Sequence, residues 1–493
     1  MTATRTAPEV GGGERTASWG IGAAAVCATA AFLVLLIPGL RHWFVLPVVL
    51  CGVLVAPDAV DWARGRLDTF DPRAVLGVVG VHFFFLAPLL HVALDYWPRY
   101  VPPSADWRDA LGRMALLNVA GLLLYRTTVG PVAGRGPDAG TGRVAPPVDV
   151  ARLRAIGTAV VVVSLLAFLW VVARFDGPTG YLSSLADDRD ELTGLGSILL
   201  VAGLFPLIVF VLFLVRHRDH LRDHPKTTAA LVAALGVAQL VVGGLNGSRA
   251  HTVWPVLLAI GMCHLLVARV RRRTLVAAFL AGLAFMYVYG FYKNVGSAAL
   301  GLLTGATSTA ELSAETGRDV PLLLLGDLGR ADVQALTLQR QREGTAAVGN
   351  GITYVGDLAF LVPARVLPVR PPDKVEVGTD VLHGEGAYDS GLRTSQVFGL
   401  AGEAVLNFGA AGAVLSFAAL GGFVRVAGRI HRRALDAGSL PWPGPLGPGL
   451  LAAVLPVSVL LVLGSDLGNL AWFLVNHVVV LAAIVFASRR RTA

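Results

Sequence analysis

The stretch "ILLVAGLFPLIVFVLFLV", from Ile198 to Val215, carries no charged residue over a length that matches a lipid bilayer. Similar apolar blocks run from Trp19 to Ile37 and from Ile156 to Val172. About 20 helical residues cross the roughly 30 Å hydrocarbon core of a membrane. The blocks therefore predict membrane-spanning α-helices. We interpret the block from Trp19 to Ile37, the first along the chain, as a retained span rather than a cleaved signal peptide.

The composition agrees with this fold class along the whole chain. Of 493 residues, 55% are hydrophobic and only 15% are charged, whereas an ordinary soluble protein has about 25% charged residues. We expect an all-α polytopic membrane protein of about 12 transmembrane helices. The apolar runs that predict them are centred near residues 28, 50, 84, 117, 165, 205, 235, 259, 282, 411, 456 and 477.

Several classes of site are not indicated by the sequence. The formal charge of +8 is explained without nucleic-acid binding, because most of the positive charge falls in short loops, where it orients the membrane spans. Cys27, Cys51 and Cys263 all lie inside apolar runs, which leaves neither a disulfide framework nor a zinc cluster. P-loop, zinc-protease, hydrolase and dinucleotide-binding motifs are missing from the sequence. We therefore expect no metal and no cofactor.

The basic clusters predict which loops face the cytoplasm. If both termini are cytoplasmic, the densest clusters fall inside, as positive charge prefers; they are "RHRDHLRDHPK", "RVRRR", "RVAGRIHRR" and the tail "RRRTA". The predicted organisation is a cytoplasmic tail (1–17), transmembrane helices 1–9 (18–290), a large extracytoplasmic loop (291–396), transmembrane helices 10–12 (397–487) and a cytoplasmic tail (488–493).

The loop 291–396 is far longer than a connection requires, and such loops are usually functional or disordered. It contains apolar runs, which argue against disorder, and a weak amphipathic pattern in "RADVQALTLQRQREG". We expect two or three short helices that lie on the outer membrane face and cap a cavity.

Charged side chains gather on the outer side against the positive-inside trend. Arginine makes planar, bidentate contacts with phosphate, so a lipid-linked diphosphate would be a natural partner. A lone loop arginine is more often a solvated charge, and we prefer that interpretation for Arg340, Arg342 and Arg393. The other outer cations are Arg249, Arg330, Arg365, Arg370 and Lys374, and the anions include Asp327, Asp332, Asp357, Asp380, Glu385 and Glu403.

Two ionisable residues stand out because they adjoin hydrocarbon. Arg249 lies in a turn too short to hold it far from the bilayer, and arginine at a bilayer centre costs roughly 2.5–3.5 kcal/mol on insertion scales. Glu403 lies in an otherwise apolar run, and Asn407 follows four positions later on the same helix face. This polar stripe either faces a cavity or serves interhelical hydrogen bonds.

Three segments together resemble the oligosaccharide repeat-unit polymerases, the Wzy-like O-antigen polymerases. "NGSRAH" is similar to a Gly-Ser-Arg that this family has at an outer turn between spans. "NGITYVGDLAFLVPARVLPVRPP" is similar to its loop pattern of Gly and Tyr, an apolar stretch, then Pro and Arg, and "GEAVLNFGAAGAVL" to its Gly-Glu-x-x-x-Asn-Phe-Gly. Arg365 and Arg370 match the family pattern less closely than Arg249 and Glu403, because the usual aromatic and the Pro-Arg pair are altered.

The resemblance implies a metal-independent glycan polymerase of the cytoplasmic (inner) membrane. It would transfer a growing chain from one polyprenyl diphosphate to the sugar end of a lipid-linked repeat unit. Its implied partners are the lipid bilayer, polyprenyl-diphosphate-linked oligosaccharide and a chain-length regulator or flippase.

Site residues follow from this chemistry. Arg249, helped by Arg330 or Arg365, would stabilise the diphosphate leaving group. Glu403 or His251, with Asp332 behind them, would act as general base, although His251 equally fits an interfacial side chain and Glu403 could instead orient Arg249. The implied substrate-binding residues are Arg330, Tyr354, Arg365, Arg370, Lys374 and Asn407.

Three alternatives stay open. A flippase or exporter of lipid-linked sugars would typically carry repeated halves, and no repeat is evident in this sequence. An O-antigen-ligase-like enzyme, or a glycosyltransferase using a polyprenyl-monophosphate sugar, would keep the chemistry class and change the acceptor or donor. A membrane scaffold would leave the outer arginines and Glu403 replaceable.

Overall fold

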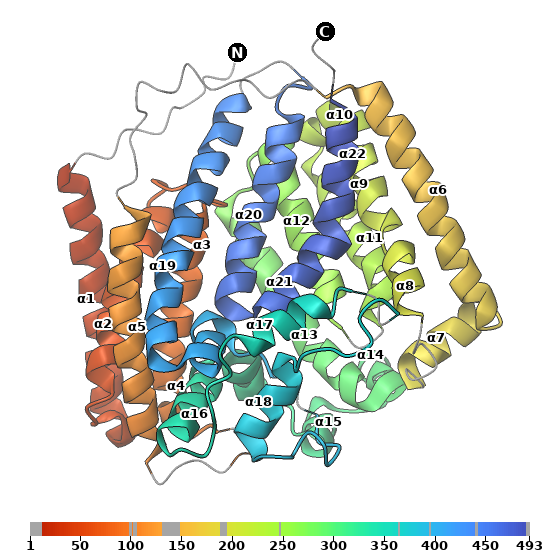
Figure 1. Cartoon of the computed structure of the whole chain (residues 1–493). Coiled ribbons are helices and arrows are strands. Elements are labelled where there is room, and N and C mark those ends of the chain that lie inside the picture. The colour runs from red at the N-terminus through yellow and green to blue at the C-terminus, as the bar shows by residue number, and fades with distance from the viewer. Residues whose placement is uncertain are drawn as a thin grey trace. The chain divides into compact units, whose positions relative to one another are not determined.

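The computed structural model describes residues 12–97, 101, 106–130, 148–187, 195–245, 248–362, 365–393, 396–438 and 442–489. Predictions that fall on the first eleven residues, on Asn246 and Gly247 of "NGSRAH", on Pro363 and Ala364, or on the last four residues lie outside this range. Across the described residues the elements are helices without a β-strand, which confirms the all-α class (Figure 1).

The chain divides into two compact units, and each is described by itself. Unit 1 comprises residues 1–143, 324–429 and 458–472, and unit 2 comprises 144–323, 430–457 and 473–493. Four helices contribute residues to both units: η7 (Leu322–Asp327), α19 (Gly399–Ala437), α20 (Leu446–Gly464) and α21 (Leu467–Phe473).

Each unit also has helices of its own. Those of unit 1 are α1 (Gly12–Leu36), η1 (Pro38–Leu40), α2 (Val45–Ala63), α3 (Pro72–Val81), η2 (His82–Leu86), α4 (Ala87–Ala93), α5 (Trp107–Val129), α16 (Ala331–Arg342), α17 (Ile352–Ala359) and α18 (Lys374–His383). Those of unit 2 are α6 (Val150–Arg174), α7 (Pro178–Asp187), α8 (Gly196–Ala202), α9 (Phe205–Arg216), α10 (Arg218–Asp223), α11 (Pro225–Gln239), η5 (Leu240–Gly244), α12 (Ala250–Leu266), α13 (Arg272–Val295), η6 (Gly296–Leu300), α14 (Gly301–Thr304), α15 (Thr309–Thr316), η8 (Leu474–Val479) and α22 (Val480–Ala487).

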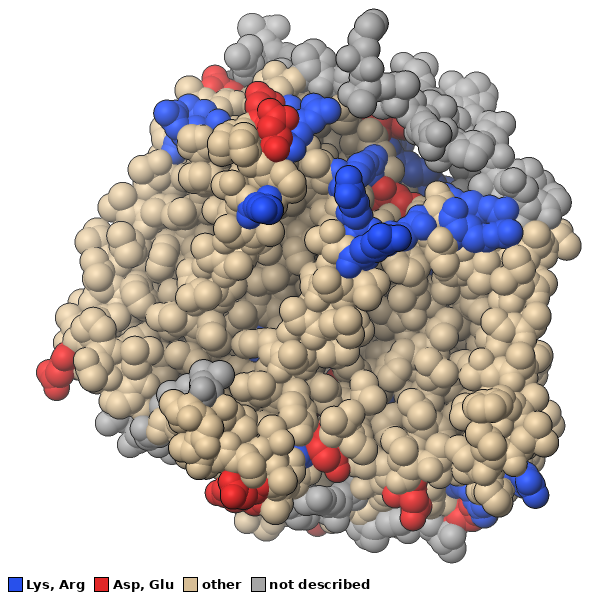
Figure 2. All heavy atoms as spheres, turned by 180° about the vertical axis from the view of Figure 1, so that it is seen from behind, with Lys and Arg blue, Asp and Glu red and all other residues tan. Residues whose placement is uncertain are grey.

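Ten helical stretches among the described residues are long and apolar enough to cross a membrane. Their apolar side chains are widely exposed, as with Leu35 at 73% and Phe279 at 60%, which suits faces that meet lipid. On the face of the molecule in Figure 2, most of the described surface consists of residues other than lysine, arginine, aspartate and glutamate. These features support a multi-pass membrane protein.

The predicted number of about 12 spans stays a prediction. The two further helices that it requires are α12, whose 17 residues make it shorter than the ten, and α5, which carries Arg113 and Arg126. The predicted orientation of the termini also stays a prediction.

Helix starts follow the local sequence. Asp71 precedes Pro72 and accepts a hydrogen bond from the backbone N–H of Arg73, and Asp149 accepts two such bonds at the start of α6. A short acceptor ahead of the first turn satisfies N–H groups that have no partner within the helix. Ser308 and Glu311 form a reciprocal capping box at α15.

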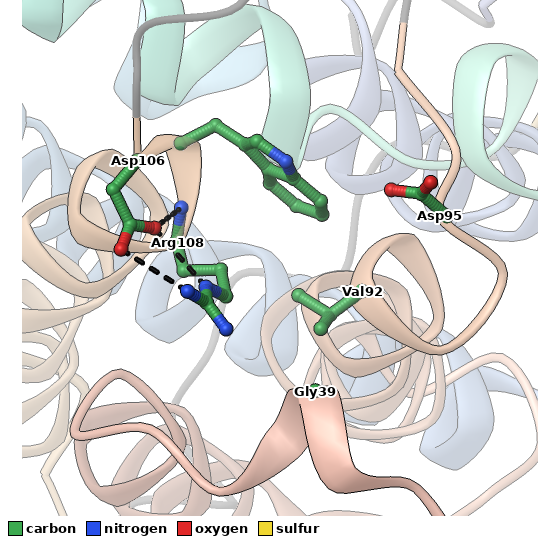
Figure 3. Close-up of a pocket in the computed structure, with 6 residues that line it drawn as sticks. Gly39, Val92, Asp95, Asp106 and Arg108 are labelled. Atoms are coloured by element: carbon green, nitrogen blue, oxygen red, sulfur yellow. Dashed lines mark hydrogen bonds and ion pairs between the residues drawn. The ribbon is translucent and has the colours of Figure 1, made fainter.

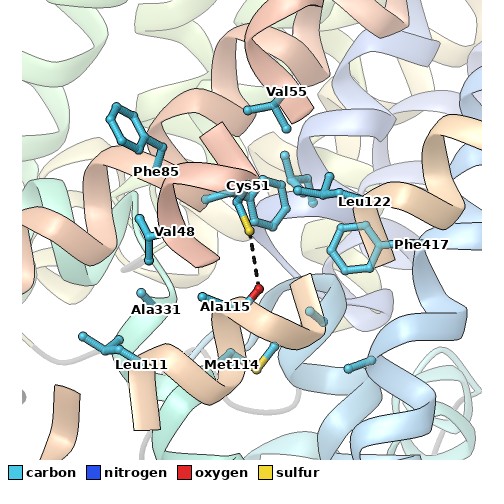
Figure 4. Packing of buried hydrophobic residues seen from close by; sticks show 14 of the residues in the cluster. Val48, Cys51, Val55, Phe85, Leu111, Met114, Ala115, Leu122, Ala331 and Phe417 are labelled. Carbon is cyan, nitrogen blue, oxygen red and sulfur yellow. Dashed lines mark hydrogen bonds between the residues drawn. The ribbon is translucent and has the colours of Figure 1, made fainter. Parts of the chain in front are cut away.

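The core of unit 1 is formed mainly by α2, α5 and α19. Phe84 and Phe417 are buried with ring centroids 5.7 Å apart, and the Cys51 thiol lies 3.5 Å from the carbonyl oxygen of Ala115 (Figure 4). Gly121 allows the ring of Phe417 to approach α5, since a Cβ there would collide with it. Small residues at such contacts let membrane helices pack closely.

The predicted loop 291–396 contains α14 to α18, more short helices than expected, and α13 extends past Phe291 to Val295. The helix predicted in "RADVQALTLQRQREG" is present as α16. The prediction that this helix is amphipathic was wrong. All residues from Ala331 to Leu338 are buried, because α16 packs against both α5 and α18.

Candidate functional site

Glu403 lies on a short buried helical segment rather than on a continuous span. Gly409 interrupts α19 with φ 66° and ψ −157°, a backbone conformation that favours glycine. From Ala401 to Asn407 every residue is buried, and Glu403 is only 3% exposed. The segment ahead of Gly409 therefore holds a carboxylic acid inside unit 1.

The N-terminus of α21 faces three carboxylates. The backbone N–H of Leu467 donates to Oε2 of Glu403 (3.0 Å), and that of Gly468 donates to Oδ2 of Asp357 (3.0 Å). The N–H of Asn469 donates to Oδ1 of Asp466 (2.8 Å). The first N–H groups of a helix have no partner within it and carry partial positive charge, so they favour anions. We call Asp357, Glu403 and Asp466 the carboxylate cluster.

Lys374 supplies a cation to this cluster. It is the first residue of α18, which Asp373 caps, and its ammonium group forms an ion pair with Oδ2 of Asp466. The Lys374 side chain is 12% exposed and that of Asp466 is fully buried. Within the described part of the chain, the ammonium group of Lys374 thus lies near three carboxylic groups.

The surroundings of Asp357 raise the pKa of its carboxyl group. Burial raises its pKa from 3.8 to about 6, the charge of Asp466 adds to the rise, and Lys374 opposes it. A Cβ at Gly468 would lie 2.7 Å from Oδ2 of Asp357, so glycine is what lets this carboxylate reach the helix terminus. A carboxyl with a pKa near the working pH suits general acid–base chemistry.

One oxygen of Glu403 is available for further bonding. Oε2 accepts from Leu467, whereas Oε1 is buried and has no hydrogen-bond partner among the described residues. A buried acceptor without a partner costs roughly 1–3 kcal/mol, and more when it is charged. Buried polar atoms of this kind call for an explanation such as a catalytic role.

Asn407 joins the Glu403 segment to α17. Its Nδ2 donates to Oγ1 of Thr353 (2.6 Å) and to the carbonyl of Glu403 (2.9 Å), and its Oδ1 accepts from the backbone N–H of Thr353 (3.3 Å). Asn407 and Thr353 are fully buried. This geometry matches the interhelical hydrogen-bonding alternative and makes Asn407 a positioning residue.

Tyr354 lies beside the same group of residues. Its ring centroid is 6.0 Å from that of Phe408, and its pKa is raised by burial and then by the negative charges of Glu403 and Asp357. A phenol that stays protonated can donate to an oxygen of a ligand. Of the predicted residues, Glu403, Asn407, Tyr354 and Lys374 are therefore brought together.

Asp332 belongs to a different pair. Its carboxylate lies 4.0 Å from Nε2 of His91, and both residues are buried. Nδ1 of His91 is 2.9 Å from the carbonyl of Tyr96, which assigns the proton on this nitrogen to that bond. His91 could not be identified from the sequence, because a lone histidine in an apolar run has no distinguishing pattern.

The arginines of the loop have diverse surroundings. The Arg330 guanidinium donates to the carbonyls of Gly464 (3.1 Å) and Gly326 (2.6 Å), and therefore holds the backbone. Arg370 donates to the carbonyl of Val362 (2.7 Å) and lies over the Phe360 ring. Arg365 is exposed. Substrate contacts of all three stay predictions.

Arg249 and His251 belong to unit 2, where Arg249 directly precedes α12. The His251 ring lies against η5, because a Cβ at Gly243 would be 2.8 Å from its Nδ1. The predicted pairing of Arg249 with Glu403 joins residues of different units and stays a prediction.

A separate pocket of about 310 Å³ lies at the ends of helices in unit 1. Asp106 and Arg108 form a bidentate ion pair in its wall (3.0 and 3.2 Å), with Asp95 and Trp107 around it (Figure 3). The pair mutually satisfies its charges, and we assign the pocket no role in the chemistry of the carboxylate cluster.

Comparison with known proteins identifies no relative. No protein-family model, curated protein or solved structure matches the chain.

Proposed function

We propose that this protein is a membrane glycan polymerase that joins polyprenyl-diphosphate-linked oligosaccharide repeat units. The observation that carries the proposal is the direct hydrogen bonding between two of the three family-like segments. Asn407 of "GEAVLNFG" is bonded to Thr353 of "NGITYVGD", 54 residues away in sequence. The N–H of Gly349, the residue directly before the second segment, also donates to the carbonyl of Leu406 (3.0 Å).

The proposed chemistry uses the carboxylate cluster as a proton acceptor. Glu403, through its available Oε1, or Asp357, through its raised pKa, takes the proton of the acceptor hydroxyl. The acceptor oxygen then forms a bond to the anomeric carbon of the donor sugar, and the bond from that carbon to the diphosphate oxygen breaks. Negative charge develops on the diphosphate, and Arg249 is the proposed cation for it.

Lys374 and Asn407 have positioning roles in this proposal. Lys374 neutralises Asp466 and lowers the pKa of Asp357, which keeps part of that group ionised at neutral pH. Asn407 fixes the distance between α17 and the Glu403 segment. The reaction would take place on the outer face of the cytoplasmic membrane, as the distribution of basic loops predicts.

A second candidate, a transporter for lipid-linked sugars, is favoured by one observation. Interrupted helices that carry a buried charge are typical of transporter binding sites, and α19 is interrupted at Gly409 six residues after Glu403. A transporter would leave the substrate chemically unchanged, which separates the two candidates experimentally.

The test is glycan length in cells that carry Glu403→Gln, Arg249→Lys or the control Glu343→Gln, with equal membrane levels of each protein. Glu343 is exposed at the end of α16 and its amide replacement keeps an acceptor. Loss of long polymer with single repeats accumulating outside, in the first two variants only, supports the polymerase. Single repeats accumulating inside would indicate the transporter. Normal polymer in all variants would exclude a role of Glu403 and Arg249 in either polymerisation or transport. The membrane scaffold would then be the remaining interpretation.

A ligase is distinguished by the product. If Glu403→Gln leaves free lipid-linked polymer of normal length but prevents its transfer to a second acceptor, the enzyme is a ligase.

A further inference from the structure

The short helix α17 has two faces of opposite character. On one side, Thr353, Gly356 and Asp357 are buried; Asp357 belongs to the carboxylate cluster and Thr353 is hydrogen-bonded to Asn407. On the other side, Val355 is 55% exposed and Leu358 is 48% exposed. A helix with one apolar face turned outward needs an apolar environment for that face.

Apolar exposure continues beyond the end of α17. Phe360 is 52% exposed, Val366 is 73% exposed and Val369 is 82% exposed. We call the exposed apolar residues of this region the α17 patch: Val355, Leu358, Phe360, Leu361, Val366 and Val369. Soluble surfaces rarely carry so many large apolar side chains together.

The α17 patch adjoins a surface that a membrane span presents to lipid. Tyr354 of α17 contacts Phe408 of α19 with ring centroids 6.0 Å apart. Phe408, directly before the interruption at Gly409, is 50% exposed, and Leu415, on the part of α19 after the interruption, is 63% exposed. Since α19 is one of the ten candidate spans, the hydrocarbon that covers its exposed residues lies next to the patch.

Cationic side chains border the α17 patch. Arg365 is exposed, and Arg370 is anchored to the Val362 carbonyl with its guanidinium over the Phe360 ring. Helices that lie in a membrane surface combine an apolar face at the acyl boundary with arginine or lysine at the level of the lipid phosphates. Long cationic side chains can reach those phosphates while their stems stay in apolar surroundings.

We propose that α17 is an interfacial membrane helix, whose α17 patch inserts into one bilayer leaflet while Arg365 contacts lipid phosphate. The buried face of the same helix then holds Asp357 just below the lipid surface. The site therefore draws its ligand from the membrane interface. This inference concerns lipid contact and does not depend on the glycan-polymerase proposal.

The experiment uses the full chain with Cys27, Cys51 and Cys263 replaced by alanine. A single cysteine at Val355, Leu358 or Val369 is labelled with bimane, and Glu343→Cys is the control for an exposed polar position. The proteins are reconstituted in phosphatidylcholine–phosphatidylglycerol vesicles with or without brominated acyl chains. We expect bromolipid to quench the patch labels roughly threefold more than the control label, and iodide to do the reverse.

Iodide quenching at Val355 and Val369 equal to that at Glu343 would overturn the proposal, because the patch would then face water. Protection from both quenchers would overturn it as well, because protein would then cover the patch. If the cysteine-free parent does not fold, the same cysteines are added to the unmodified chain and the parent signal is subtracted. None of these readouts requires polymer formation, so failure here is distinct from failure of the proposed function.

Discussion

Two polar regions of unit 1 differ in how their charges are balanced. Between α2 and α5, Arg126 donates to Asp58 (2.8 Å) and to the carbonyl of Leu54 (2.8 Å), so one cation meets one anion. The carboxylate cluster instead gathers three carboxylic groups around one lysine and a helix terminus. A matched buried pair holds helices together, whereas a surplus of one charge perturbs pKa values and marks a candidate for chemistry.

The largest expected effect on stability comes from breaking the ion pair between Asp58 and Arg126. Asp58→Ala leaves the Arg126 guanidinium without its carboxylate, and we expect a loss of about 3–5 kcal/mol in the free energy of unfolding. Thermal unfolding of the detergent-solubilised protein measures it. The double variant Asp58→Leu with Arg126→Met should recover most of the loss. If the single variant unfolds at the unmodified temperature, the pair does not hold α2 and α5 together.

Asp357 provides the opposite case, in which removing a charge stabilises the protein. Its folded-state pKa of about 6 lies above the ordinary 3.8, so the folded protein binds this proton more tightly. Stability therefore falls as pH rises from about 4 to about 6 and stays reduced above that range. At pH 7.5, Asp357→Asn should raise the unfolding free energy by up to about 3 kcal/mol.

Asp357→Asn should also abolish polymer formation, or abolish the dependence of polymer yield on pH near 6. Melting curves and polymer yield at pH 5 and 7.5 test both expectations together. A variant less stable than wild type at pH 7.5 would show that the ionised carboxylate is already stabilised by its partners.

Lys374→Met sharpens the comparison by removing the cation that is paired with Asp466. Because Lys374 lowers the pKa of Asp357, the acid limb of the pH profile should move to higher pH, and activity at pH 7 should fall. The matched control is Lys374→Arg, which keeps the charge. An unchanged profile in Lys374→Met would exclude Asp357 as the group that titrates.

The smallest effect concerns the join between α17 and α19. Asn407→Ala removes three hydrogen bonds of a buried side chain, and we expect a stability loss of about 1–3 kcal/mol with reduced polymer length. Ser416→Ala removes only a local bond to the carbonyl of Ala413 and is the control. Equal behaviour of the two variants would deny Asn407 a positioning role.

The fold class could be predicted from the sequence because it depends on local apolar runs. Every predicted span centre falls within a helix, from residue 28 in α1 to residue 477 in η8. The interruption at Gly409 was not predicted, since the apolar pattern continues through it from Val397 onward. The presence of glycine at position 409 did not predict the interruption, because many glycines in the described residues lie within regular helices.

The candidate site was predicted only in part. Glu403 was identified because an acid within an apolar run is unusual, but Asp466 was not among the predicted site residues. Its partners are distant in sequence, with Lys374 92 residues away, and the bond from Gly468 to Asp357 spans 111 residues. No periodicity within one segment encodes such meetings, which depend on how α17, α18, α19 and α21 pack.

The most direct test of the carboxylate cluster is the rate of polymer synthesis by purified protein in vesicles. The comparison is between Glu403→Gln and the double variant Asp58→Leu with Arg126→Met, which removes the balanced ion pair. Loss of a positioned general base typically costs about 10²–10⁴-fold in rate, so we predict that loss for Glu403→Gln, with its folding unchanged. The double variant should polymerise at close to the unmodified rate. Rates equal to that of the unmodified protein for both Glu403→Gln and Asp357→Asn would contradict the account, because neither candidate base of the carboxylate cluster would then be needed.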